Sequence, residues 1–405
     1  MIKLWSKGYQ FGDMMERFTV GNDYILDKKD EDCHTAIENY LTTTLGEVGK
    51  KIHTARSRND QVLVALRLYS KSQILEVVEA CTLLAHSLSL FAKKYALVPI
   101  PGRTHMQWAM PSSLGLWAGA FAESIVDDIQ LLQSAYVIVD QCPLGSASSY
   151  GVSLEIDRQY VSDLLGFAKV QNNVLYCNNS RGKFEAVVLH ALVQVMSDLS
   201  KLSSDLIFFS LPELQYLSLP KEFCSGSSMM PQKNNPCALE LIRGKSATVS
   251  SFLMQVLEII RPLISGYNRD FQETKAPLMN GFDICLSSIL VMSKTVDNLV
   301  VHSDNCLQAF KGEIFATDLA LQALKQGLYF RDAYQKVAAG MSQVEASDPV
   351  KNILEKNHLG ATGNLGIDLI SHNIKDIKIW ISSEKDRQQI VFDRAILIEE
   401  THERI

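Results

Sequence analysis

Residues 61–98 contain neither glycine nor proline, and this uninterrupted stretch limits the fold more than any other feature of the chain. Apolar residues recur along it at the three- and four-residue spacing of one helix face. They include Leu63, Leu66, Leu68, Ile74, Val77, Val78, Cys81, Leu84, Leu88 and Phe91. Ordinary globular helices are shorter than this stretch. The pattern therefore predicts a rod-like helix that belongs to a large bundle.

Four more long helices are expected further along the chain. Pro236 and Pro277 fall where a proline in the first helical turn is tolerated, and Pro262 marks a helix end. Alternating patterns rich in Val, Ile and Tyr, which would indicate strands, are scarce. The sequence thus predicts an all-α fold with a central bundle of about five long helices. The four further helical stretches cover residues 116–141, 183–209, 236–261 and 277–307.

The pattern divides the chain into a short N-terminal region at 1–55, a central bundle at 56–307 and a C-terminal helical region with a tail at 308–405. The last part of the tail, from Ile374 onward, is charge-rich and is expected to form a peripheral helix or strand. Residues 183–209 are apolar around more than one helix face. Such helices usually bury their second face against a partner chain, so we expect homo-oligomerisation.

Composition excludes several classes of protein. A net charge of −6 provides no general basic field for nucleic acid or for an anionic membrane. The N-terminal residues lack the apolar core of a signal peptide, and no run of about 18 uncharged apolar residues predicts a membrane span. Eight cysteines stand far apart, without zinc-ligand spacing. We interpret them as reduced thiols and expect a cytoplasmic protein without a metal site.

Polar residues gather at four points, each at an expected helix end. Ser, Asn, Asp and Gly at such places are commonly explained by helix capping and turn formation. A functional interpretation stays open beside it: backbone N–H groups at the start of the rod, with Arg56 and Arg58, would bind a carboxylate. His105 beside Thr104 on a Gly-Pro turn suits proton transfer. The four clusters are HTARSRNDQ (53–61), PGRTHMQ (101–107), SGSSMMPQKNNP (225–236) and SGYNRDFQETK (265–275).

Two common catalytic motifs are excluded by the letters themselves. RGKSA (243–247) looks like the end of a phosphate-binding loop, but Leu239 stands where that loop requires glycine. Neither Ser227 nor Ser228 lies in G-x-S-x-G or in S-x-x-K, so serine-hydrolase chemistry of those types is not supported.

The segment GSSMMPQKNNP (226–236) resembles the signature loop of the fumarase/aspartase superfamily, G-S-S-x-M-P-x-K-x-N-P. Within that superfamily, HTARSRNDQ, GRTHMQ, PLGSAS (143–148), YNRDFQETK and FATDLA (315–320) are similar to the argininosuccinate lyase family. The match runs from about residue 3 to about residue 364. The resemblance implies a three-domain helical lyase that assembles as a homotetramer, with each site built from three subunits. It also implies reversible β-elimination of argininosuccinate to arginine and fumarate, without metal or organic cofactor.

Four residues match the family positions that carry the chemistry. Ser227 and His105 correspond to the two proton-transfer groups. The sequence leaves open which is the base, and we favour serine as base and histidine as acid. Lys233 would stabilise the serine anion and the charge that accumulates on the substrate carboxylate. Glu240 matches the carboxylate that orients or charges the histidine.

Seven further residues match positions that contact substrate in the family. Arg58 is the expected partner of a substrate carboxylate, and Asn235 would donate to the same charge as Lys233. The full set is Arg58, Asn59, Thr104, Asn235, Tyr267, Gln272 and Lys275.

The chain also departs from the family pattern. Gly21 stands where a substrate-binding serine is usual, and a helical hairpin usually present before the DEDxHT segment is missing, since Asp27 runs almost directly into KKDEDCHTAIE. Asn234 and Cys237 replace the lysine and aspartate often found there. Two alternatives follow: a lyase of the same superfamily with another fumarate-yielding substrate, and a non-catalytic structural or regulatory protein on the same scaffold.

Overall fold

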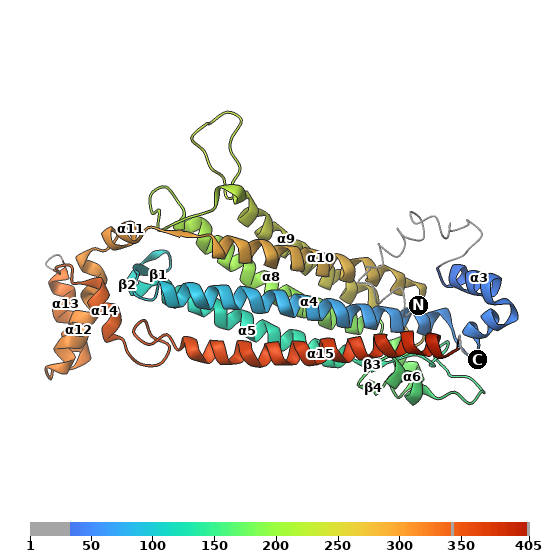
Figure 1. Ribbon diagram of the computed structural model, residues 1–405. Helices are drawn as coiled ribbons and strands as arrows, with labels where there is room; N and C mark the ends of the chain where they lie inside the picture. The colour runs from blue at the N-terminus through green and yellow to red at the C-terminus, as the bar shows by residue number, and fades with distance from the viewer. Residues whose placement is uncertain (1–32, 342–343, 403–405) are drawn as a thin grey trace.

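The computed structural model describes residues 33–341 and 344–402, and within them an elongated helical bundle dominates (Figure 1). The bundle confirms the all-α prediction. Five of its long helices correspond to the five expected from sequence, and a sixth, α15, lies alongside them. They are α4 (Arg58–Lys94), α5 (Leu114–Val139), α8 (Lys183–Phe209), α9 (Cys237–Ile260), α10 (Lys275–Asp297) and α15 (Ile367–His402).

The rod α4 owes its start and its burial to local sequence. Ser57 forms the N-cap, since its Oγ accepts from the Asn59 N–H at 3.2 Å, and the Asp60 carboxylate accepts in return from the Ser57 N–H at 2.9 Å. This capping box satisfies N–H groups that the first turn leaves unpaired. Apolar residues then face the core at every turn and are inaccessible to solvent, among them Ile74, Val78, Cys81, Leu84 and Leu88.

Two helix ends differ from the sequence prediction. The rod ends at Lys94 rather than near residue 98, because the following residues enter a β-hairpin. The helix expected at 277–307 ends at Asp297, where residues 300–301 pair with a strand and a separate short helix follows. Both ends lack the glycine or proline that would have marked them at the right place.

The sequence predicts that the tail forms a peripheral helix or strand. Instead, helix α15 is part of the bundle. It packs along α4 and α5 through an apolar stripe of Ile370, Ile374, Ile377 and Ile381, which are between 2% and 6% exposed. The three- and four-residue spacing of these isoleucines is that of one helix face. The many charged residues of this helix occupy its other faces, which masked the stripe in the sequence analysis.

A cluster of charged side chains between α15 and helices α4 and α5 links α15 to the bundle. Lys71 of α4 pairs with Asp140 at the end of α5, and Arg387 of α15 pairs with the same carboxylate and with Glu384. The Tyr136 hydroxyl donates to Glu384 at 2.9 Å. Burial lowers the pKa of Lys71, while the charge of Asp140 acts in the opposite direction. Charges buried in this way are tolerated because each is paired and hydrogen-bonded.

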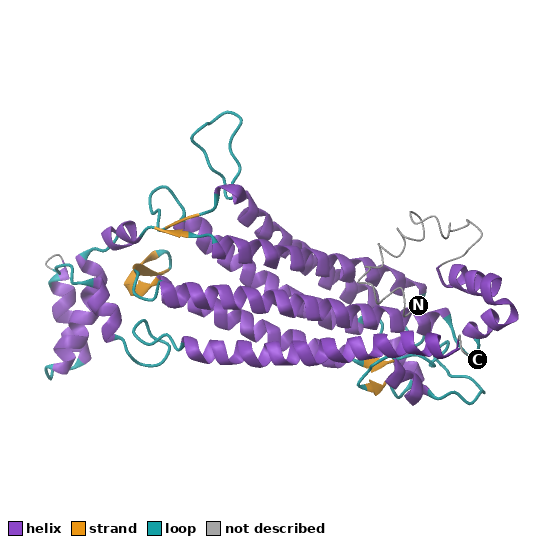
Figure 2. Cartoon of the chain, viewed as in Figure 1, coloured by secondary structure: helices purple, strands orange, loops and turns teal. Residues whose placement is uncertain are grey.

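Strands in the described residues are short and lie at the ends of the bundle (Figure 2). The main pair is an antiparallel hairpin in which Thr104 pairs with Gln107, so its turn has two residues. The strands are β1 (Pro99–Thr104) with β2 (Gln107–Ser113), antiparallel; β3 (Gln141–Cys142) with β4 (Lys169–Val170), parallel; and β5 (Leu217–Ser218) with β6 (Val300–Val301), antiparallel.

Short helices connect these elements and form a small helical group beyond the hairpin (Figure 1). They are α3 (Cys33–Leu45), η1 (Gly46–His53), α6 (Arg158–Leu164), α7 (Val174–Asn179), η2 (Lys221–Phe223), η3 (Arg269–Thr274), α11 (Ser303–Gln308), η4 (Gly312–Phe315), α12 (Ala316–Lys325), α13 (Phe330–Ala339) and α14 (Pro349–Glu355).

Two helical segments, Arg58–Lys94 and Arg269–Asp297, are long and apolar enough to cross a membrane. Length and composition alone are weak evidence for a span, because core helices of a bundle pass the same test. Both segments contribute to the hydrophobic core here, and α4 packs directly against α10.

Candidate active site

The candidate residues separate into two groups at opposite ends of the bundle. Helix α4 has 37 residues, which at 1.5 Å per residue gives a rod of about 55 Å. One group lies where α4 and α10 begin, and we call it the α4 end: Arg58, Asn59, Tyr267, Gln272 and Lys275. The other lies toward the far end of α4, at the hairpin and at the start of α9, where a loop projects from the side of the bundle (Figure 1), and we call it the loop end: Thr104, His105, Ser227, Lys233, Asn235 and Glu240.

Asp60 holds the α4 end together from inside. Its side chain is fully buried, and its carboxylate accepts from the Ser57 N–H and, at 3.0 Å each, from the N–H groups of Gly145 and Ala147. Burial raises the pKa of Asp60, while its hydrogen bonds to the three N–H groups act to lower it. The PLGSAS segment is thereby tied to the first turn of α4, directly beside Arg58 and Asn59.

The segment that carries Tyr267 is anchored by Asn179. The Asn179 Oδ1 accepts from the Gly266 N–H at 2.8 Å, and its Nδ2 donates to the Ser265 Oγ at 3.2 Å. Gly266 has a φ of 96°, a conformation that favours glycine. The sequence analysis did not single out Asn179, because Asn at the end of a short helix is ordinary turn chemistry.

Tyr267 and Gln272 form a pair at the α4 end. The Gln272 Nε2 donates to the Tyr267 hydroxyl oxygen at 2.9 Å, and both side chains are half-buried. Lys275 follows as the first residue of α10. On the α4 side, the Arg58 Nη2 donates to the Thr35 Oγ1 of α3 at 2.8 Å. Hydroxyl, amide, ammonium and guanidinium groups gathered in this way suit the binding of carboxylates.

At the loop end, residues 225–236 form a protruding loop closed at its base by two hydrogen bonds. The Ser225 N–H donates to the Asn235 carbonyl at 3.0 Å, and the Asn235 N–H donates back at 2.8 Å. Inside the loop, the Ser227 Oγ accepts from the N–H groups of Met229 at 3.3 Å and Met230 at 3.1 Å. Met229 is 86% exposed, so the loop faces outward.

His105 lies at the tip of the hairpin, which corrects the expected Gly-Pro turn. Pro101 and Gly102 fall inside β1, at an irregularity of the strand pairing, and His105 with Met106 forms the turn. Their φ values are 53° and 62°, in the left-handed region that few residues other than glycine adopt. Strain of this kind often accompanies functional positions. Thr104 and His105 are both exposed.

The side chains expected to perform the chemistry have few partners within one chain. The side chains of His105, Lys233 and Glu240 are exposed, and none makes a hydrogen bond or ion pair with a residue that the structure describes. The predicted contact between Glu240 and His105 is therefore not formed within the described chain. Gly21, the departure noted in the sequence, lies outside the described residues.

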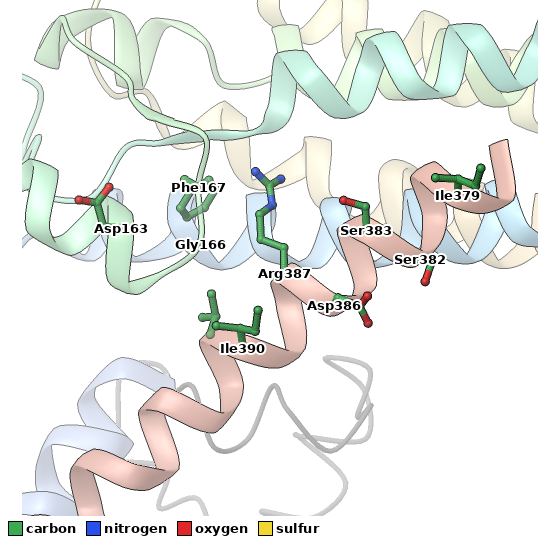
Figure 3. A pocket seen from close by; sticks show the side chains of 10 residues that line it. Asp163, Gly166, Phe167, Ile379, Ser382, Ser383, Asp386, Arg387 and Ile390 are labelled. Atoms are coloured by element: carbon green, nitrogen blue, oxygen red, sulfur yellow. The ribbon is translucent and has the colours of Figure 1, made fainter. Parts of the chain in front are cut away.

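A hollow of the surface lies between α15 and the segment that joins α6 to β4 (Figure 3), and none of the candidate residues lines it. Ile379, Ser383 and Ile390 line one side and Phe167 the other. Arg387, the cation that lines it, is already paired with two carboxylates. The described residues also contain no group of three or more His, Cys, Asp or Glu suited to a metal ion.

Comparison with known proteins gives consistent similarities. A family model described as lyase matches residues 10–251. The argininosuccinate lyase of Thermotoga neapolitana is 40% identical over 387 residues, covering 83% of this chain and 97% of that protein. The argininosuccinate lyase of Sorangium cellulosum is 42% identical over 349 residues, covering 86% and 81%. The crystal structure of EDDS lyase with formate covers 99% of this chain and 86% of its own, with a TM-score of 0.82 at 21% identity, which supports the fold alone.

Proposed function

This chain belongs to the argininosuccinate lyase family and is a lyase, and from this membership we propose that it catalyses the reversible β-elimination of argininosuccinate to arginine and fumarate. The reaction removes a proton from a carbon beside a carboxylate, and a guanidino nitrogen then leaves. It therefore needs a base, an acid and fixed positive charge or N–H donors around the carboxylate.

The environment of Ser227 is the observation that best supports this reaction. A serine hydroxyl is a poor base unless its anion is stabilised. The Ser227 Oγ already accepts two backbone N–H groups, from Met229 and Met230, and such donors stabilise an oxyanion. We assign Ser227 as the base that removes the proton. Lys233 on the same loop adds positive charge, and Asn235 supplies a further donor to the substrate carboxylate.

We assign His105 as the acid that protonates the departing nitrogen. The hairpin turn presents its imidazole to the outside, where it is free to meet a substrate held by another chain. Thr104, beside it, would contact the substrate. Glu240, in the first turn of α9, would orient or charge the imidazole once the two come together.

The α4 end is proposed to bind the substrate. Lys275 and Arg58 would pair with substrate carboxylates, and the Tyr267–Gln272 pair and Asn59 would supply hydrogen bonds. Neither proton-transfer residue, Ser227 nor His105, lies at this end. Proton transfer is therefore assigned to the loop end, with Thr104 and Asn235 in contact with the substrate there, and the remaining binding contacts to the α4 end.

The separation of the two ends supports a homotetramer in which subunits share sites. Groups separated by the length of a helix, about 36 Å for the 24 residues of α9 and about 55 Å for the 37 of α4, cannot act on one small molecule, so the loop end of one chain must meet the α4 end of another. Exposed apolar side chains on α9 and α10 offer a surface for such packing, among them Leu241, Met254 and Leu290, which are 63%, 55% and 48% exposed. We propose a cytoplasmic enzyme that acts without metal or organic cofactor.

The test is fumarate release from argininosuccinate by the purified full chain, followed by ultraviolet absorbance. Release establishes the lyase. No release, combined with turnover of another fumarate-yielding substrate, would support the superfamily alternative. An assembled protein that turns over neither would favour a structural or regulatory role.

A further inference from the structure

Arg181 is a buried cation that has no assigned part in the proposed reaction. It lies between α7 and α8 and is only 2% exposed. Its guanidinium stands over the ring of Tyr267, 5.1 Å from the centroid, and over the ring of Phe271, 5.6 Å away. Its Nη1 and Nη2 atoms are buried and have no hydrogen-bond partner among the residues that the structure describes.

Arg67, a second buried arginine nearby, shows how unusual this is. Arg67 is 4% exposed and stacks over Phe184 at 4.5 Å, but it also donates to the Gln141 carbonyl at 2.6 Å and to the Ser180 Oγ at 2.9 Å. Buried guanidinium groups are normally hydrogen-bonded in this way. The Arg181 guanidinium lies against two aromatic rings instead, so its described contacts are cation–π interactions with Tyr267 and Phe271.

The charge around Arg181 is compatible with a cation. Burial lowers the pKa of Arg181, while the negative charge of Glu185 opposes that change. Glu185 lies in the first turn of α8 and is itself 6% exposed. Gly182, which follows Arg181 with a φ of 73°, has no room for a Cβ: the atom would lie 2.1 Å from the Ile260 Cγ2. The turn that presents the guanidinium is therefore closely packed on α9.

The rings under Arg181 belong to the segment that carries the substrate contacts. Tyr267 accepts the Gln272 amide N–H, so fixing the Tyr267 ring also fixes Gln272. A cation over an aromatic face contributes most when it is desolvated, as here. We propose that Arg181 is a positioning residue for substrate binding, which holds the Tyr267–Gln272 pair in the orientation that receives the substrate. This inference rests on the proposed function of that pair.

The experiment compares the kinetics of Arg181→Met and Arg181→Lys with those of Arg67→Met as the matched control. For Arg181→Met we expect KM for argininosuccinate to rise about tenfold, which corresponds to about 1.4 kcal/mol, with kcat within about twofold. Arg181→Lys keeps the charge but loses the planar stack, so a rise of about threefold is expected. Arg67→Met removes an equally buried stacked arginine that does not touch Tyr267, so it should lower Tm while KM stays unchanged.

An unchanged KM in folded Arg181→Met, or an equal rise in Arg67→Met, would overturn the inference. If Arg181→Met does not fold, Arg181→Lys carries the test, and an unchanged KM there has the same meaning. Crystal structures of the Arg181 variants add a readout that needs no activity. A displaced Tyr267 ring supports positioning and an unmoved ring contradicts it, even if wild-type protein releases no fumarate and the proposed function fails.

Discussion

The two ends of the bundle are built in opposite ways. At the α4 end, hydrogen bonds of Asp60, Asn179 and the Tyr267–Gln272 pair connect the substrate-binding segments; Asp60 is buried, the pair is half-buried and Asn179 is exposed. At the loop end, His105, Lys233 and Glu240 are exposed and make no side-chain bonds to the residues described. The binding residues proposed at the α4 end are thus held by contacts within one chain, whereas the proton-transfer residues would take their final positions only in the proposed assembly.

The largest effect is expected at the loop end, from Ser227→Ala. Removal of the proposed base should lower kcat by about 10³-fold, because positioned proton transfer contributes on that scale. KM and the size of the assembly should remain close to wild type, since the α4 end is untouched. Steady-state kinetics with light scattering checks both. Activity near wild type would show that Ser227 is not the base. Proton transfer by Ser227 could then no longer distinguish the loop end from the α4 end.

Mixing variants tests whether the two ends of different chains share a site. Ser227→Ala damages only the loop end, and Lys275→Glu only the α4 end, so each alone should be nearly inactive at low substrate. Dissociated and reassembled together in equal amounts, they should recover about a quarter of wild-type activity, because sites that combine two intact ends then form.

The control for this mixture is Ser227→Ala combined with a chain that carries both substitutions. No mixed site in that pair has an intact loop end, so no recovery is expected. A lack of recovery in the first mixture, with hetero-assemblies verified by mass, would place both ends of each site in one chain.

Lys275→Ala should have an intermediate effect that belongs to binding. Loss of a charge-assisted hydrogen bond to a substrate carboxylate corresponds to a rise in KM of about 10- to 100-fold. The value of kcat should change little, since the loop end is intact. Initial-rate kinetics over a wide substrate range separates the two constants. A collapse of kcat at constant KM would instead assign Lys275 to the chemistry.

The smallest effects are expected on the stability of the fold, and they test whether the α4 end is more tightly packed than the loop end. Asp60→Ala leaves three N–H groups without an acceptor, two of them buried and that of Ser57 half-buried, and we expect a loss of about 2–4 kcal/mol in the free energy of unfolding. Met229→Ala, in the exposed loop, should change it by no more than about 0.5 kcal/mol. Urea denaturation at one protein concentration measures both. Equal losses would mean that the loop end is as tightly packed as the α4 end.

Much of the fold was predictable because helical periodicity is a local signal. The five long helices follow from it, and the capping residues before Arg58 mark the start of α4 closely. The hairpin was missed because Pro101, Gly102 and the left-handed pair His105–Met106 carry no strand pattern. Helix α15 was misplaced because charges on its outer faces hide the four-isoleucine stripe.

The candidate residues could be identified from sequence motifs, but their arrangement in space could not be predicted from them. Nothing local in the sequence states that His105 and Tyr267 lie at opposite ends of a rod, since that depends on the path of the whole chain. Arg181 and Asn179 escaped notice for a similar reason. Their importance comes from the rings and backbone groups of residues 265–271, which lie far away in sequence and beside them in space.

The return of α15 along α4 has a consequence for the order in which the chain is made. The ion pair between Lys385 and Glu79 joins positions 306 residues apart, and Arg387 supplies a partner for the Asp140 carboxylate. At about 5–20 residues per second, a ribosome adds these residues roughly 15 to 60 s after those of α4. Until then the groove that α15 will fill lies open, with apolar side chains of α4 and α5 facing water. The nascent protein therefore completes its bundle only after α15 has been synthesised, and until then a chaperone that covers this groove would shield its apolar side chains.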